Sequence, residues 1–182
     1  MNEQQFKLFQ EGRIDDLVSI LEKELESNPN DSEIKTDLGL AYHYGGRYND
    51  AIRVYEKLLE IDPNDPHILV NVGLDYHMVR NNDKAIQTFK KVIEQAKTKT
   101  VESLLLSLAH TNLGVVYEAI TRFEDAVREY KTAISTDSSN HLAPKYLEQL
   151  KEMGDTDYGL LRVRVLPDGT RRQELWYYHD VD

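Results

Sequence analysis

The feature that most constrains the fold of this chain is a pattern that recurs along most of its length. Gly, Tyr, Ala and an aromatic residue appear in the same order and spacing in three segments. They are Gly39, Tyr42, Ala51 and Tyr55; Gly73, Tyr76, Ala85 and Phe89, 34 residues later; and Gly114, Tyr117, Ala126 and Tyr130, a further 41 residues on. A fixed period of about 20 to 50 residues is typical of solenoids, in which each unit packs on its neighbours. The sequence therefore predicts a stack of similar units.

Each unit is predicted to be two helices joined by a tight turn. In the copy at 32–65, apolar residues follow a helical period over 34–42 and again over 51–59. Gly45-Gly46-Arg47 separates the two runs, which indicates a break between helices. A larger side chain at Gly39 would push the two helices apart, so we expect this glycine to leave room for the opposing backbone.

The repeated residues resemble the pattern of the tetratricopeptide repeats: a Leu-Gly pair, a Tyr three residues later, an Ala, an aromatic residue and a closing Pro. Leu38-Gly39, Val72-Gly73 and Leu113-Gly114 match the pair. The resemblance covers about residues 3 to 140 and implies an all-α fold, a right-handed solenoid of helix-turn-helix repeats. There are two departures from the family: Lys35, Leu69 and His110 stand where it often has Trp, and the last two copies lack the closing Pro.

The repeat also predicts how the chain is divided. We expect a partial first copy at 1–31, complete copies at 32–65, 66–99 and 107–140, an insertion at 100–106, a capping helix at 141–153 and a tail at 154–182. The insertion accounts for the longer step of 41 instead of 34 residues, a difference of seven. Seven residues are nearly two helical turns and this segment has no Gly or Pro, so it is predicted to lengthen a helix. A longer loop is the alternative.

The last two segments have separate roles. Ser138-Ser139-Asn140 can cap the helix at 141–153, which would cover the apolar face that an open solenoid leaves at its end. In the tail, apolar and polar residues alternate over 161–166, turn residues occupy 167–170, and an extended pattern returns over 171–178. This predicts a short C-terminal β-hairpin.

Isolated hairpins are marginally stable in water, so the hairpin is expected to bury one face. It can pack on the array, pair or exchange with a second copy of the chain, or bind a partner. The residues predicted to mediate self-association are Leu161, Val163, Val165, Leu175, Trp176 and Tyr178.

Composition excludes several classes of function. With 22 Lys and Arg against 32 Asp and Glu, the net charge of -10 argues against binding to nucleic acid or to anionic membranes. The absence of cysteine excludes disulfides, thiol catalysis and Cys-ligated metals. The sequence has no apolar run of about 18 residues and no secretory leader, so a cytoplasmic location is predicted.

Motifs for catalysis or metal binding are not found. None of the six histidines has the spacing of a metal site. His43 and His77 occupy equivalent places in neighbouring copies, but helix pairs about 10 Å apart keep such residues from sharing a zinc ion. Phosphate-binding loops, dinucleotide fingerprints and nucleophile elbows are also absent from the sequence. The prediction is therefore a protein with no enzymatic activity, no cofactor and no metal.

Resemblance to the family implies that a concave surface, lined by the first helix of each copy, binds an extended peptide or a helix of a partner protein. Carried over by repeat position, the lining residues are Glu33, Thr36, Leu40, His43, Tyr44, His67, Val70, Asn71, Leu74, His77, Met78, Leu108, Thr111, Asn112, Val115 and Glu118. Asn71 and Asn112 match an Asn that the family commonly uses to bind peptide backbone. The family's Lys and Asn clamp for a carboxylate is not recognisable, which favours an apolar or mildly basic ligand.

The function predicted from the sequence is a scaffold for protein-protein interaction. The alternative is a structural protein that assembles with itself through the C-terminal hairpin. Some of the apolar residues assigned to the groove could instead pack under the terminal helices.

Overall fold

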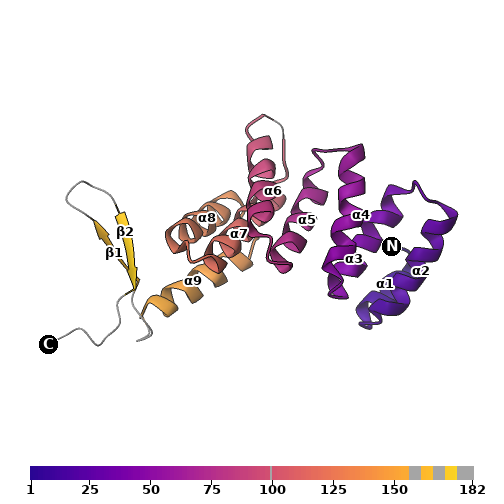
Figure 1. Cartoon of the computed structure of the whole chain (residues 1–182), viewed down its shortest axis with the longest axis horizontal. Coiled ribbons are helices and arrows are strands. Elements are labelled where there is room, and N and C mark those ends of the chain that lie inside the picture. Colours follow the sequence, from indigo (N-terminus) through magenta and orange to yellow (C-terminus); the bar gives the residue numbers. More distant parts are fainter. Residues whose placement is uncertain (99, 156–160, 166–170, 176–182) are drawn as a thin grey trace.

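The computed structural model describes residues 1–98, 100–155, 161–165 and 171–175 of the 182-residue chain. The helices are α1 (Glu3–Gln10), α2 (Ile14–Ser27), α3 (Ser32–Tyr44), α4 (Tyr48–Ile61), α5 (Pro66–Met78), α6 (Asn82–Gln95), α7 (Ser103–Ala119), α8 (Phe123–Thr136) and α9 (Leu142–Asp155). Figure 1 shows them stacked in one elongated row, each packed beside its neighbours along the chain. The predicted helical solenoid is confirmed, with one helix pair for each copy of the pattern.

Acidic caps fix where the first helices of the complete copies begin. Asp31 accepts hydrogen bonds from two backbone N–H groups at the start of α3, at 2.9 and 3.0 Å. Asp65, 34 residues later, does the same for α5 at 2.9 and 3.2 Å. These N–H groups have no partner within the helix, so each cap stabilises the helix start by about 1 kcal/mol.

Each repeated glycine makes room for an aromatic ring of the same copy. A methyl group placed on Gly39 would lie 2.5 Å from Cε1 of Tyr55, and one on Gly114 would lie 2.5 Å from Cε1 of Tyr130. Gly73 faces Phe89 in the same way, at 2.7 Å. The sequence prediction placed the opposing backbone there, and the structure corrects it to a side chain, because a fully buried ring fills the space between the two helices.

The tyrosines of the first helices join consecutive copies. The hydroxyl of Tyr42 donates to a carboxylate oxygen of Glu22 on α2 at 2.6 Å, and Tyr76 donates to Glu56 on α4 at the same distance. Burial, assisted by the hydrogen bond to Glu22, raises the pKa of Tyr42 to about 12. Since neutral Tyr is the donor, both contacts persist throughout the physiological pH range.

The insertion lies partly in a helix and partly in a loop. α7 begins at Ser103 and has 17 residues, whereas α3 and α5 each have 13. Of the seven residues predicted to be helical, 103–106 extend α7 by about one turn, and 100–102 belong to the connection from α6. The prediction of a helical 100–106 is therefore too long by three residues. Leu105 is buried in the core, which accounts for the added turn.

A buried polar cluster attaches α9 to α7. The side-chain amide of Asn140 donates to the hydroxyls of Ser107 and Thr111, each at 2.8 Å. Its carbonyl oxygen accepts from the backbone N–H groups of Leu142 and Ala143, at 3.0 and 3.4 Å. One asparagine thus caps α9 and holds it against the preceding copy, in the place where Asp31 and Asp65 cap α3 and α5. The capping helix begins one residue after the predicted start of 141.

Two short strands follow the helices. β1 (Leu161–Val165) pairs antiparallel with β2 (Arg171–Leu175), with Leu161 opposite Leu175 and Val165 opposite Arg171. The predicted turn at 167–170, together with Trp176 and Tyr178, lies outside the described residues. The hairpin as an association surface therefore stays a prediction.

Candidate functional site

The residues predicted to bind a partner lie on the first helices of three pairs. α3 carries Glu33, Thr36, Leu40, His43 and Tyr44; α5 carries His67, Val70, Asn71, Leu74, His77 and Met78; α7 carries Leu108, Thr111, Asn112, Val115 and Glu118. The structure buries two of them, Val70 and Thr111, and so removes both from any contact surface. Thr111 accepts a hydrogen bond from Asn140 instead. We call the remaining residues, with Phe6 and Phe9 of α1, the first-helix face.

α1 contributes to this face although its copy is incomplete. The ring of Phe9 contacts that of Tyr44 edge to face, with centroids 4.8 Å apart. Phe6 is 50% exposed. Both residues were missed because the partial copy lacks the Gly and Tyr landmarks before Gly12. The 34-residue step would have found them, since it leads from Leu40 back to Phe6 and from His43 back to Phe9.

Large apolar side chains on this face remain accessible to solvent. Besides Phe6, Tyr44 on α3 is 58% exposed and Met78 on α5 is 47% exposed. Leu40 and Leu74, at equivalent positions of α3 and α5, are half-buried. Together they give the first-helix face an apolar character over three neighbouring copies.

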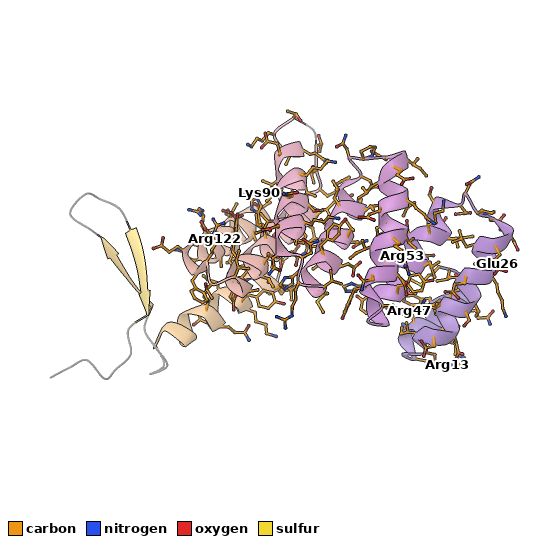
Figure 2. All side chains as sticks on the ribbon, viewed as in Figure 1. Arg13, Glu26, Arg47, Arg53, Lys90 and Arg122 are labelled. Atoms are coloured by element: carbon orange, nitrogen blue, oxygen red, sulfur yellow. The ribbon has the colours of Figure 1, made fainter. Side chains whose placement is uncertain are left out.

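Charge is unevenly distributed between the first and second helices. Arg13, Arg47, Arg53, Lys90 and Arg122, which Figure 2 labels, all belong to second helices or to the residues that precede them. No Lys or Arg belongs to the first-helix face, whereas Glu33 and Glu118 do. Beside them, Asp37 of α3 pairs with the amino group of Met1 at 2.5 Å. The face is therefore apolar with an acidic bias.

The two equivalent histidines have different partners. His77 Nδ1 lies 2.9 Å from the side-chain oxygen of Asn82, at the start of α6. His43 Nδ1 lies 2.6 Å from Oδ1 of Asp75, which reaches it from the next first helix, α5. His43 also contacts the rings of Tyr44 and Tyr48 edge to face, with centroids 5.3 and 5.7 Å away. His43 thus links two copies, whereas His77 stays within its own.

Asp75 is the functional candidate that the sequence prediction overlooked. Its side chain has no exposed surface, and burial raises the pKa of its carboxyl group, against the opposing effect of the hydrogen bond from His43. Its second oxygen, Oδ2, has no hydrogen-bond partner in the described part of the chain. The 34-residue step gave the signal: the same position holds buried Ala41 in one neighbouring copy and buried Val116 in the other.

Tyr55 supplies a second unpaired group next to this carboxylate. Its hydroxyl is buried and has no hydrogen-bond partner among the described residues. Burial, then the nearby charge of Asp75, raises the pKa of Tyr55; Asn71 opposes this rise from a position outside hydrogen-bond geometry. The equivalent Tyr130 differs, because it donates to Glu118 at 2.9 Å.

Two further searches of the described residues return nothing. They contain no group of three or more His, Asp or Glu side chains arranged to hold a metal ion. No helix among them has both the length and the apolar character that crossing a bilayer requires.

Known families match the helical part of the chain. A family model described as TPR repeat matches residues 25–79, and one described as Tetratricopeptide repeat matches residues 66–139. The chain belongs to the tetratricopeptide repeat family. No curated protein matches it. The two models leave out α1 and most of α2, where the sequence pattern is incomplete.

Solved structures share the fold. A crystal structure of MamA has a TM-score of 0.66 at 22% identity, covering 85% of this chain and 86% of that one. MamA from Desulfovibrio magneticus RS-1, from residue 41 to the end, has a TM-score of 0.65 at 18% identity, covering 83% and 81%. The first TPR of Spaghetti (RPAP3), bound to the HSP90 peptide SRMEEVD, has a TM-score of 0.58 at 19% identity, covering 69% and 94%. At these identities the likeness concerns the fold alone.

Proposed function

We propose that this tetratricopeptide repeat protein is a non-catalytic interaction module that binds a segment of a partner protein along the first-helix face. The observation that carries the proposal is the row of exposed apolar side chains, Phe6, Tyr44 and Met78, on three neighbouring first helices. Contiguous exposed apolar surface is a feature of interaction sites in soluble proteins. The rigid helix pairs hold these side chains in place before the partner arrives, which limits the entropy lost on binding.

Two asparagines support binding of a polypeptide in particular. Asn71 on α5 and Asn112 on α7 occupy equivalent positions and are both partly exposed. An amide side chain offers both a donor and an acceptor, so it can pair with the N–H and C=O groups of an extended main chain. The structurally similar RPAP3 domain, bound to an HSP90 peptide, also supports a peptide ligand.

The chemistry of the face selects among peptides. The HSP90 peptide SRMEEVD is acidic at its C-terminal end. The first-helix face has no Lys or Arg to hold such carboxylates and has an acidic bias of its own. We therefore expect the partner segment to be apolar or basic.

Substitution of Leu74 by Glu tests this function. Leu74 is half-buried in the middle of the face, so a carboxylate there would have to lose its hydration when an apolar segment binds. Selection of short displayed peptides on the wild-type chain should yield binders that lose at least about tenfold in affinity on Leu74→Glu, roughly 1.4 kcal/mol. Met78→Glu, at a more exposed position, should have the same effect with less risk to folding.

Ile61→Glu is the matched control. Ile61 is 67% exposed at the end of α4, a second helix, and it lies outside the first-helix face. This variant should bind as the wild type does, and all three variants should keep the helical circular dichroism spectrum. Equal binding by the wild type, Leu74→Glu and Met78→Glu would reject the first-helix face as the binding surface.

Self-assembly through the tail is the second candidate. It is favoured by the two-stranded sheet of β1 and β2, because each strand has an outer edge that can accept another strand. Sedimentation of the full chain and of a chain ending at Met153 compares the two cases. The assembly hypothesis requires the full chain to be larger than a monomer and the shortened chain to be monomeric.

A further inference from the structure

The first-helix face contains one buried charge that the fold does not require. Asp75 stands where the neighbouring copies have Ala41 and Val116, all three of them buried. Placing an isolated carboxylate in the interior costs several kcal/mol. Two other copies build the same step of the solenoid with an apolar residue, so stability alone does not account for Asp75.

The groups around Asp75 are incompletely paired. Oδ1 contacts His43 at 2.6 Å, while Oδ2 of Asp75 and the hydroxyl of Tyr55 have no partner among the described residues. An ionised carboxylate has about four acceptor sites, so Asp75 can accept more hydrogen bonds than it receives. Buried polar groups are paired in the great majority of proteins, and exceptions suggest a functional role.

His43 lies between this carboxylate and the first-helix face. The His43 side chain is 27% exposed, whereas that of Asp75 is fully buried. Rotation of the imidazole into solvent would open Asp75 to the face without moving a helix. The neighbouring rings of Tyr44 and Phe9 would remain at the edge of the opening.

We propose that Asp75 and Tyr55 bind the positively charged head of a Lys or Arg side chain from the partner segment, which displaces the ring of His43. This proposal rests on the proposed function of the first-helix face. A Lys ammonium group has three donors and Arg has five, and the carboxylate oxygens and the phenol oxygen are the acceptors that they need. The aromatic rings of Tyr44 and Phe9 suit both the aliphatic stem and the cation.

Charge complementarity supports a basic occupant. The face has no Lys or Arg, its acidic members are Glu33 and Glu118, and the whole chain has a net charge of -10. An acidic side chain would meet a buried carboxylate of the same sign. An apolar side chain would leave Asp75 Oδ2 and the Tyr55 hydroxyl unpaired, which binding of a cation avoids.

A set of synthetic peptides tests the proposal with the full chain. The peptides share one apolar background and differ only at a central position, which is Lys, Arg, Leu or Glu. The wild type should bind the Lys and Arg peptides at least about tenfold more tightly than the Leu peptide, as expected for a charge-assisted hydrogen bond. Asp75→Asn, which keeps the shape, and Asp75→Ala, which copies the second repeat, should both abolish that preference and still bind the Leu peptide.

Glu33→Gln is the matched control, because it removes one exposed acid of the same face and keeps Asp75. It should retain most of the preference. Equal affinity of the wild type for the Lys and Leu peptides would overturn the cation site and leave the interaction module standing. An equal loss for all peptides on Asp75→Asn would overturn it too, because Asp75 would then only support the wall. Binding of none of the peptides, with no effect of Leu74→Glu on any displayed peptide, would instead reject the proposed function.

Discussion

Two steps of the solenoid bury polar side chains between consecutive first helices, and they do so in opposite ways. Between α7 and α9, Asn140 bonds to two hydroxyls and to two backbone N–H groups, and the Ser107 hydroxyl donates to the carbonyl of Ala133 at 2.8 Å. Between α3 and α5, Asp75 has one partner, His43, and leaves an oxygen unpaired beside the unpaired hydroxyl of Tyr55. The first step is neutral and paired; the second is charged and incomplete.

The difference separates structural polarity from functional polarity. A fully paired polar cluster stabilises one arrangement of its helices, and the α7–α9 cluster holds the end of the array in place. An incompletely paired buried charge lowers stability, so its presence indicates a role in binding. The first-helix face adjoins the incomplete step, where His43 is partly exposed.

The largest effect is expected from Asn140→Ala. This change removes the cap of α9 and two buried hydrogen bonds, and it leaves the buried N–H of Ala143 without its partner. The free energy of unfolding should fall by about 2 to 3 kcal/mol, measured by urea unfolding. Amide hydrogen exchange should show the loss first in α9.

Asn64→Ala is the control for this prediction, since Asn64 is an exposed loop residue one position before the cap Asp65. Its free energy of unfolding should change by less than about 0.5 kcal/mol. If Asn140→Ala changes stability as little as the control does, the cluster is not what holds α9.

Asp75→Ala should have a smaller effect of opposite sign. At neutral pH it replaces a buried carboxylate by the residue found at Ala41, and the free energy of unfolding should rise by about 1 kcal/mol. A decrease of similar size would mean that the ion pair with His43 stabilises the α3–α5 step.

The same variant should also change the dependence of stability on pH. Burial raises the pKa of Asp75 in the folded state above its unfolded value of about 3.9, so between these two pKa values the folded protein binds more protons. Wild-type stability therefore falls as pH rises through that window, and the contribution of Asp75 is lost above its folded pKa. The advantage of Asp75→Ala over the wild type, from urea unfolding at a series of pH values, should grow across this window.

The smallest effect comes from removing one hydroxyl at each of two equivalent tyrosines. Tyr130→Phe deletes the hydrogen bond to Glu118 and should lower the free energy of unfolding by about 1 kcal/mol. Tyr55→Phe deletes a hydroxyl without a partner in the described structure, and the next copy already has Phe89 there, so stability should be unchanged or slightly higher. Equal losses for both variants would show that the Tyr55 hydroxyl has a partner in solution.

The repeat gave access to much of the fold and to part of the site. Gly39, Gly73 and Gly114 locate the close contacts of three helix pairs because an aromatic ring lies against each of them. The extent of α7 was less predictable, since residues without Gly or Pro are compatible with both helix and loop, and burial of Leu105 decides where the helix begins.

The candidate site was harder to predict for a related reason. A first-helix position does not by itself separate an exposed residue such as Met78 from a buried one such as Thr111. Thr111 is buried because Asn140, far away in sequence, reaches it from the start of α9. Asp75 was overlooked because its importance depends on a contact with another copy.

Sequence alone determined the period, the helix pairs and the family, because steric fit between glycine and an aromatic ring recurs locally in every complete copy. Only the tertiary structure decided which side chains remain on the surface and which polar groups find partners. Those properties depend on contacts between copies, where His43 meets Asp75 and Asn140 meets Ser107. Side chains separated by a whole repeat in the chain become neighbours only after the helix pairs have stacked.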